Sequence, residues 1–325
     1  MEYFSVIGGL VLLVVGGDKL VEGAVALAER LHVSKLIIGI TVVSFGTSAP
    51  ELVVGIDAAM SDAPGLALGN IVGSNIANIL LVLGIPAILY PFACDDKEIR
   101  RSLFYMVLAT MMFIILSLFG PLYIWQGSIM LALLGLFLFY SVRRAGKDSG
   151  GRKHDTVLAE HAREDVVESD TIRDMSVPMA LVMTLLGLTG LIFGAHILVD
   201  GAVIIARTAE IPETVIGLTV IAIGTSLPEL ATSIMAARHN HGDVVMGNII
   251  GSNLFNILAI MGVTTILTPV SVPEQFFYAD FPIMIATSLM LVPLATGKIK
   301  ITRLTGLVFF LLYIIYLLFL ARQLV

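Results

Sequence analysis

The stretch VVSFGTSAPELVVG, residues 42–55, places a proline and a glutamate inside a segment apolar enough to cross a bilayer. Both residues are costly there, because proline removes a helical hydrogen bond and a carboxylate in mid-span costs about 2.5–3.5 kcal/mol on insertion scales. The same arrangement returns as VIAIGTSLPELATS at residues 220–233. Prolines kink many membrane helices without any function, but two glutamates at equivalent positions favour a functional site.

The composition is typical of a polytopic membrane protein. Of the 325 residues, 57% are hydrophobic and 14% are charged, against about 25% charged in soluble domains, and the mean hydropathy is +0.96. Long apolar runs predict spanning helices, whereas a membrane barrel would show alternating segments of about ten residues. The first run has Glu2 instead of a basic region, so we expect a transmembrane helix there rather than a signal peptide. Cys94 is the single cysteine, which excludes an intramolecular disulfide and a cysteine-based zinc site.

Breaks between the apolar runs divide the chain into two groups of five helices. The prediction is an all-α membrane protein with ten transmembrane helices, at 3–29, 34–60, 66–90, 102–119, 121–142, 175–206, 212–238, 243–268, 277–295 and 301–321. The hydrophilic segment between the groups is too short for an independent domain. The predicted domains are therefore a five-helix membrane region at 1–142, a linker at 143–174 and a second five-helix membrane region at 175–325.

The positive charges predict the orientation of the chain. Of the 19 Lys and Arg residues, 16 fall on one side of the ten helices, whereas Arg207 and Arg322 fall on the other side and Lys19 lies within the first span. Loops rich in Lys and Arg stay in the cytoplasm. We therefore expect a multi-pass protein of the plasma membrane, which is the inner membrane in a Gram-negative bacterium. Both termini are expected outside and the linker in the cytoplasm.

An internal repeat supports the division into halves. A shift of 178 residues aligns Gly16–Gly84 with Gly194–Gly262 without a gap, and about 30 of the 69 positions are identical. Five predicted helices separate the two copies, and an odd number of crossings makes equivalent helices run in opposite directions. The sequence therefore predicts an inverted-topology repeat, which is typical of secondary transporters with a site at the bilayer midplane.

The first repeated motif offers oxygen atoms to a cation. Pro50 and Pro228 each open a turn, and carbonyl groups freed in this way need a polar cavity or protein around them. Hydroxyl and carboxylate side chains flank each proline, namely Thr47, Ser48 and Glu51 in the first copy and Thr225, Ser226 and Glu229 in the second. Oxygen ligands without nitrogen or sulfur suit hard cations such as Ca²⁺ and Na⁺.

The second motif is GNIVGSNIANIL at 69–80 and GNIIGSNLFNIL at 247–258. Its polar residues at i, i+4 and i+8 share one helix face, namely Asn70, Ser74 and Asn78, then Asn248, Ser252 and Asn256. Helix packing with interhelical hydrogen bonds accounts for the glycines and for part of the polar positions. The functional interpretation has Ser74, Asn78, Ser252 and Asn256 complete the oxygen shell. Asn75 and Asn253 point about 100° away, which favours a packing role.

These two motifs, in both halves, resemble the α-repeats of the cation/calcium exchanger superfamily, which contains sodium/calcium exchangers. The resemblance implies an antiporter whose second, third, seventh and eighth helices form the cation site. Carried over position by position, it implies the ligands Thr47, Ser48, Glu51, Ser74, Asn78, Thr225, Ser226, Glu229, Ser252 and Asn256. Some exchangers carry an acid at a position matching Asn78 or Asn256, where this chain has amides at both.

The resemblance also implies that the protein is not an enzyme and needs no cofactor. The expected partners are transported inorganic cations, Ca²⁺ and Na⁺ or H⁺, and the lipid bilayer. We expect no nucleic-acid partner, and the sequence indicates no oligomeric state.

The two glutamates set the charge of the predicted site at −2 when both are ionised. One Ca²⁺ neutralises it, as do two Na⁺, two protons or one of each, whereas a third monovalent ion leaves net positive charge in a medium of low dielectric constant. Exchange of Ca²⁺ for a monovalent cation by alternating access is the leading hypothesis. A proton- or K⁺-linked exchanger of Mn²⁺ or Mg²⁺ is the alternative. A channel fits less well, because two buried carboxylates favour tight binding over rapid passage.

Polar residues outside the motifs allow other interpretations. Asp18, Glu22, His196 and Asp200 lie at equivalent positions of the first and sixth spans and either line an ion path or form structural ion pairs. His239 and His241 are expected in a solvated turn rather than in a zinc site. Trp125 is expected at the membrane interface. An intramembrane hydrolase is a remote alternative, because no histidine is expected beside a serine of the repeated motifs.

Overall fold

The computed structural model describes residues 2–61, 64–93, 97–148, 175–210, 222–296 and 300–323. These residues form helices, and the extended pairings among them are two isolated antiparallel bridges, Phe92 with Ile301 and Leu122 with Val270. The protein is therefore an all-helical membrane protein, as predicted. The predicted linker lies mostly outside the described residues, as does the first part of the predicted helix at 212–238.

The helices of the first half follow the predicted order with more breaks than expected. They are α1 (Glu2–Arg30), α2 (Lys35–Ile38), the π-helical turn η1 (Gly39–Val43), α3 (Ser44–Thr47), α4 (Ala49–Met60), α5 (Pro64–Leu80), α6 (Gly84–Leu89), α7 (Lys97–Ser117) and α8 (Ile124–Asp148). The fifth apolar span, Ile124–Ser141, ends close to the predicted residue 142, but the helix itself continues beyond it to Asp148. Arg and Lys are good helix formers, so a change to charged residues did not mark the end of the helix.

The second half repeats the long helices of the first, but its short elements differ. It contains α10 (Val177–Thr208), α12 (Ala222–Thr225), α13 (Leu227–Arg238), α14 (Gly242–Phe255), the π-helical turn η3 (Asn256–Ile260), α15 (Met261–Leu267), α16 (Gln275–Tyr278), α17 (Asp280–Ala295) and α18 (Arg303–Gln323). Within the described residues, eight helices are long and apolar enough to cross a membrane. A ninth candidate is the pair Lys35–Thr47 and Ala49–Met60, which bends by 45° at the predicted break.

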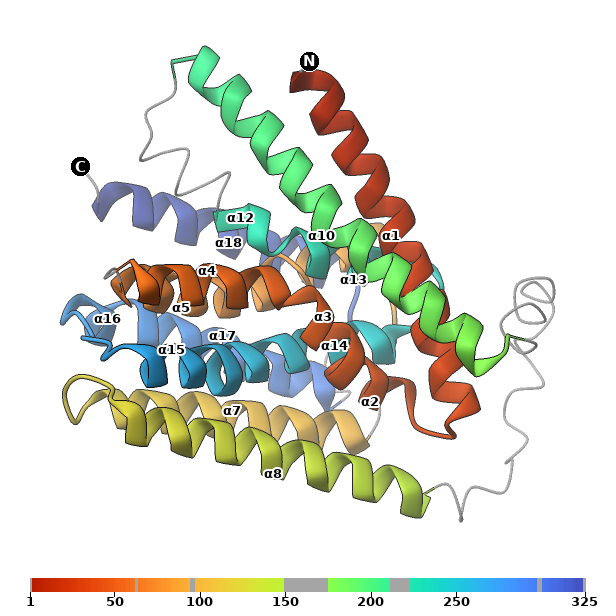
Figure 1. The fold of residues 1–325 in the computed structure, drawn as a ribbon, viewed down its shortest axis with the longest axis horizontal. Helices are drawn as coiled ribbons and strands as arrows, with labels where there is room; N and C mark the ends of the chain where they lie inside the picture. Colours follow the sequence, from red (N-terminus) through yellow and green to blue (C-terminus); the bar gives the residue numbers. More distant parts are fainter. Residues whose placement is uncertain are drawn as a thin grey trace.

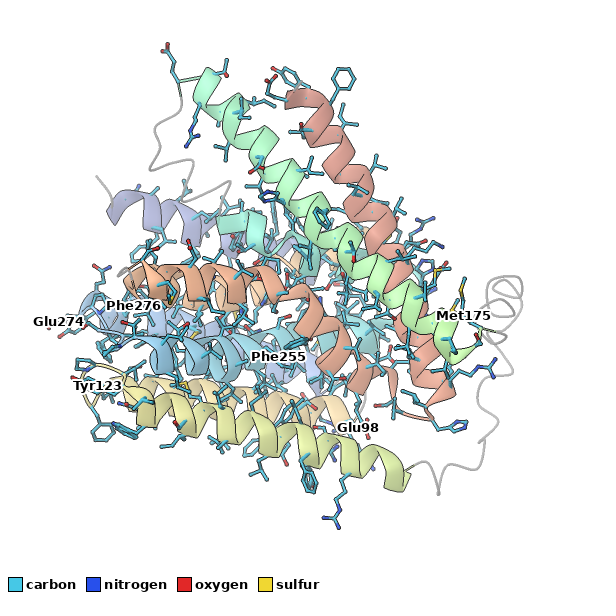
Figure 2. All side chains as sticks on the ribbon, in the orientation of Figure 1. Glu98, Tyr123, Met175, Phe255, Glu274 and Phe276 are labelled. Atoms are coloured by element: carbon cyan, nitrogen blue, oxygen red, sulfur yellow. The ribbon has the colours of Figure 1, made fainter. Side chains whose placement is uncertain are left out.

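Two spans form the centre of the bundle and the others surround them. In Gly65–Leu89 and Gly242–Leu267, 83% of the most apolar window is buried, whereas the share is 17–39% in the other six spans. The outer helices expose large apolar side chains such as Phe139 and Leu318, which suits contact with lipid. Figure 2 shows Tyr123 and Glu274 at one end of the bundle and Glu98 and Met175 at the other, so the helices run from end to end.

Helices α1 and α10 lie side by side and cross the direction of the other helices (Figure 1). Glycines line their seam and let the two backbones approach closely. A Cβ atom on Gly16 would lie 2.8 Å from the backbone nitrogen of Leu191, and one on Gly23 would lie 2.6 Å from that of Thr184. The pair therefore packs as one unit against the rest of the bundle.

Replacement of a seam glycine should separate these two helices. Gly23→Ala is expected to destabilise the protein by about 1–3 kcal/mol, because the added methyl group meets the backbone of α10. Gly8→Ala on the same helix is the matched control, since nothing lies within 4 Å of a Cβ there and alanine favours helix by about 1 kcal/mol. The measurement is the melting temperature of each purified variant in detergent. Equal melting temperatures would contradict the close seam.

Candidate cation-binding site

Two helix breaks at equivalent positions create the site. Ser48 separates α3 from α4 with φ −82° and ψ 9°, and Ser226 separates α12 from α13 with φ −88° and ψ 6°. Each break comes two residues before a proline, which is tolerated in the first turn of a helix because its missing N–H needs no partner there. The carbonyl ends of α3 and α12 therefore stop at the bundle centre, where helix C-termini favour cations.

Each break places a glutamate in the first turn of the following helix. Glu51 and Glu229 are fully buried and lie close enough to interact electrostatically. The hydroxyl of Ser48 donates a hydrogen bond of 2.9 Å to Oε1 of Glu229, which joins the two halves directly. Thr47 and Ser252 also lie beside the Glu229 carboxylate. No ion pair reaches either glutamate in the described part of the chain.

Most oxygen atoms of the predicted ligands have no protein partner. Within the described ranges, seven buried oxygens of these residues lack a hydrogen bond, namely Oε1 and Oε2 of Glu51, Oε2 of Glu229, Oδ1 of Asn78 and Asn256, and Oγ of Ser226 and Ser252. Buried polar atoms in proteins are almost always paired, so such a concentration needs an explanation. Ca²⁺ takes six to eight oxygen ligands, and this set of atoms matches that chemistry.

The central helices supply the remaining candidates. Ser74 and Asn78 on α5 are buried, and so are Ser252 on α14 and Asn256 at the start of η3. Thr225 is half-buried at the end of α12. The structure thus buries nine of the ten predicted ligands and leaves Thr225 partly exposed.

The other asparagines of the second motif have packing roles. Asn75 donates to the carbonyl of Ile71 at 2.7 Å and Asn253 to that of Ile249 at 3.0 Å, both within their own helices, as their direction predicted. Asn248 has a further role, because its side chain forms hydrogen bonds with residues of both halves of the site. The sequence places Asn248 on the same helix face as Ser252 and Asn256, but nothing in the sequence distinguishes it from a residue that only packs.

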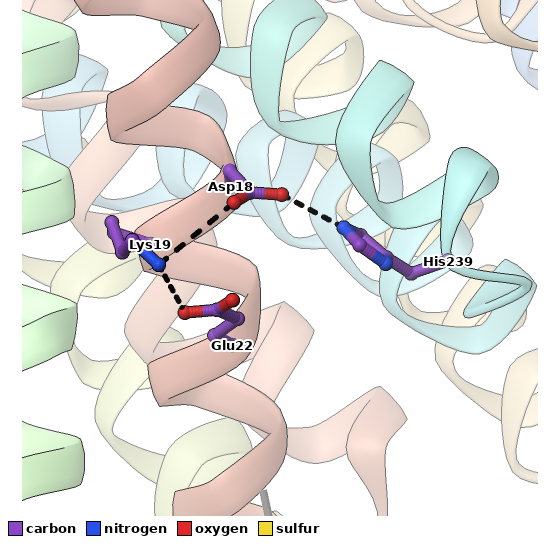
Figure 3. A network of polar contacts seen from close by, with 4 residues as sticks. All are labelled: Asp18, Lys19, Glu22 and His239. Carbon is purple, nitrogen blue, oxygen red and sulfur yellow. Dashed lines mark hydrogen bonds and ion pairs between the residues drawn. The ribbon is translucent and has the colours of Figure 1, made fainter. Parts of the chain in front are cut away.

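Charged residues tie α1 to the end of α13 (Figure 3). Nε2 of His239 lies 2.8 Å from Oδ1 of Asp18, and Lys19 bonds Glu22 at 2.7 Å. His239 lies in a turn, as expected, but its side chain contacts α1 and is only 15% exposed. The ion-pair alternative for Asp18 and Glu22 fits these contacts.

The other histidine of this turn, His241, is uncharged. Burial, with Lys35 and His239 nearby, lowers the pKa of His241 to about 3.

On α10, the exposed side chains of His196 and Asp200 lie 3.4 Å apart. No group of three or more His, Cys, Asp or Glu residues has a metal-binding arrangement anywhere in the part of the chain that the structure describes.

Comparisons with known proteins agree on one family. The model of the family "Sodium/calcium exchanger protein" matches residues 1–143 and 179–322. Inner membrane protein YrbG of Escherichia coli is 36% identical over 282 residues, which cover 87% of this chain and 85% of that protein. Sodium/calcium exchanger MaX1 of Methanosarcina acetivorans is 30% identical over 342 residues, which cover 98% of this chain and 97% of MaX1. The solved structure of the sodium-calcium exchanger NCX_Mj, soaked with Na⁺ and Sr²⁺, has a TM-score of 0.81 and 33% identity and covers 97% of this chain and 96% of its own.

A cation that binds the unpaired oxygens should stabilise the folded protein. Ca²⁺ at 100 times its Kd is expected to add about 2.7 kcal/mol, seen as a rise in melting temperature. Glu51→Gln should lose most of this rise, because the amide removes a charge from the site. Asp57→Asn is the matched control, since Asp57 lies on the same helix with an exposed side chain. An equal rise in both variants would show that Glu51 does not bind the ion.

Proposed function

The chain belongs to the sodium/calcium exchanger protein family, and we propose that it is a secondary active antiporter that exchanges Ca²⁺ for a monovalent cation, with Na⁺ as the counter-ion. Proteins of this family are membrane transporters and not enzymes, so the hydrolase alternative is excluded. The observation that carries the proposal is the contact between the halves at the bundle centre. Ser48 from the first break donates to Glu229 from the second, with Glu51 beside them.

The proposed architecture has ten spans in two inverted halves, at 1–142 and 175–325, joined by a cytoplasmic linker at 143–174. The 178-residue repeat supports it, as does the matched order of elements, since each half has a long first helix, a helix broken at Ser48 or Ser226, a buried central helix and two outer helices. The distribution of Lys and Arg supports external termini in a plasma membrane, which is the inner membrane in a Gram-negative bacterium.

The ligands act by replacing the water around the ion. In the proposed site, Glu51 and Glu229 supply the charge, while Thr47, Ser48, Ser74, Asn78, Thr225, Ser226, Ser252 and Asn256 supply neutral oxygens. A site between two oppositely oriented halves can face each side in turn, which is alternating access. The close α1–α10 pair is the natural moving unit, because it packs on itself along a seam of glycines.

The ligand set favours Ca²⁺ over Mg²⁺. Mg²⁺ demands octahedral geometry and keeps several waters, whereas Ca²⁺ accepts a flexible cage of protein oxygens. Protons and K⁺ remain the alternative driving ions and Mn²⁺ the alternative cargo. Replacement of each ion in turn during a flux measurement distinguishes these cases.

Ca²⁺ flux into proteoliposomes tests the function. An outward Na⁺ gradient should drive uptake of radioactive Ca²⁺, and Glu51→Gln or Glu229→Gln should lower the rate by roughly tenfold or more, because each removes a charged ligand. Asp57→Asn should transport at the wild-type rate. Normal uptake in both glutamate variants would refute the proposed site.

The amides at Asn78 and Asn256 predict electroneutral exchange of one Ca²⁺ for two monovalent ions. A site charge of −2 is balanced by either load, so exchange should produce no current in vesicles with a clamped membrane potential. Asn256→Asp adds a third carboxylate, and if the variant transports, its Ca²⁺ flux should depend on the potential. A wild-type flux that changes with the potential would contradict the charge argument.

A further inference from the structure

Asn248 lies at the junction of the two halves, and every polar atom of its side chain is bonded. Its amide nitrogen donates to the backbone carbonyl of Glu229 at 3.2 Å and to the hydroxyl of Ser233 at 3.0 Å. Its Oδ1 accepts from the hydroxyl of Thr47 at 3.3 Å. The carbonyl of Glu229 only accepts, so the contacts fix which way the amide points. One buried side chain thus links α14 to α13 and to the end of α3.

The contact with Thr47 orients a ligand. A hydroxyl has one proton and two lone pairs, and the oxygens beside the Thr47 hydroxyl can only accept, namely Oδ1 of Asn248 at 3.3 Å, the carbonyl of Ser44 at 3.4 Å and the carboxylate of Glu229. The lone pairs are therefore left for a cation. Ser44 in turn donates to the backbone carbonyl of Asn248 at 3.1 Å, which holds α14 against α3.

The contact with Glu229 fixes the backbone of a charged ligand. Asn248 anchors the turn of α13 from which the carboxylate extends, while Ser48 holds Oε1 of that carboxylate. The carboxylate is thereby restrained at both ends. Preorganised ligands bind metal ions more tightly because less freedom is lost on binding.

The equivalent residue of the first half lacks this network. Asn70 corresponds to Asn248, but the residue corresponding to Ser233 is Gly55, which has no hydroxyl. In the described structure the buried Nδ2 of Asn70 has no hydrogen-bond partner, and neither carboxylate oxygen of Glu51 has one. The repeat is thus asymmetric, with a restrained carboxylate at Glu229 and an unrestrained one at Glu51.

We propose that Asn248 is a positioning residue that holds Glu229 and Thr47 in the geometry that binds the cation, whereas Asn70 has no such role. This inference rests on the proposed function in one respect, namely that the site binds Ca²⁺. It also assigns different parts to the two glutamates. Protein contacts hold Glu229 at its carboxylate and its backbone, whereas no hydrogen bond holds the carboxylate oxygens of Glu51 in the described structure.

Equilibrium binding of radioactive Ca²⁺ to the purified full-length protein tests this role, with Asn248→Ala and Asn70→Ala as a matched pair. Loss of a residue that orients metal ligands typically lowers affinity by 10–100-fold, and we expect a loss of about that size in Asn248→Ala. Asn70→Ala should bind like the wild type. Without Ca²⁺, Asn248→Ala should melt at a lower temperature than Asn70→Ala, because it loses three buried hydrogen bonds. Ca²⁺ affinity is therefore measured well below that temperature, where a purely structural role would leave the affinity of the folded protein unchanged.

A second variant covers the case in which Asn248→Ala does not fold. Ser233→Ala removes one acceptor of the amide and keeps its bond to Glu229, so Ca²⁺ affinity should fall by less than in Asn248→Ala. Wild-type affinity in Asn248→Ala, or in Ser233→Ala where only that variant folds, would overturn the inference, as would an equal loss in Asn70→Ala. A wild-type protein that binds no Ca²⁺ would instead refute the proposed function, so the two failures are distinct.

Discussion

The structure depends on two carboxylates buried together without a basic partner. Glu51 and Glu229 lie at the centre of an apolar bundle, and no ion pair reaches them within the described residues. Burial of unpaired charge is strongly unfavourable, because the protein interior replaces water poorly. The surrounding hydroxyl and amide groups lower this cost only in part, and cations or protons must supply the rest. The helix breaks at Ser48 and Ser226 help to bind such cations, because only an interrupted helix brings carbonyl ends and a carboxylate to the same point.

The repeat gives the protein two similar halves, but their chemistry differs. A serine at position 233 and a glycine at position 55 are enough to complete one asparagine network and to leave the other open. The first helices of the two halves differ in the same way. Asp18 on α1 forms an ion pair with His239 in the turn after α13, whereas His196 on α10 forms one with Asp200 of its own helix. The two carboxylates of the site are likewise held differently, that of Glu229 by Ser48 and that of Glu51 by no hydrogen bond in the described structure.

The sequence predicted the helices because each one carries a strong local signal. Proline and glutamate in an apolar run are costly enough to mark both breaks, and the 178-residue repeat tied them to each other. The burial of Glu51 and Glu229 followed from the same argument.

The end of α8 was not predicted, because charged residues are good helix formers and so do not mark where a helix ends. The contact of His239 with Asp18 was missed because it depends on how α1 lies against α13, which no local pattern records. Asn248 was recognised as part of a polar face, yet its partners Thr47 and Ser233 come from other helices.

The charge of the proposed site also explains why transport would be exchange and not leakage. With one Ca²⁺ or two Na⁺ the two carboxylates are neutralised, and a neutral site moves through a medium of low dielectric constant at little electrostatic cost. Without cations the same movement carries a charge of −2 past apolar helices, which is unfavourable. The empty site therefore tends to stay on the side where it released its ion until a new load binds there. In the proposed mechanism, coupling would then need no separate gate for each ion, because the buried carboxylates would permit movement only when they are occupied.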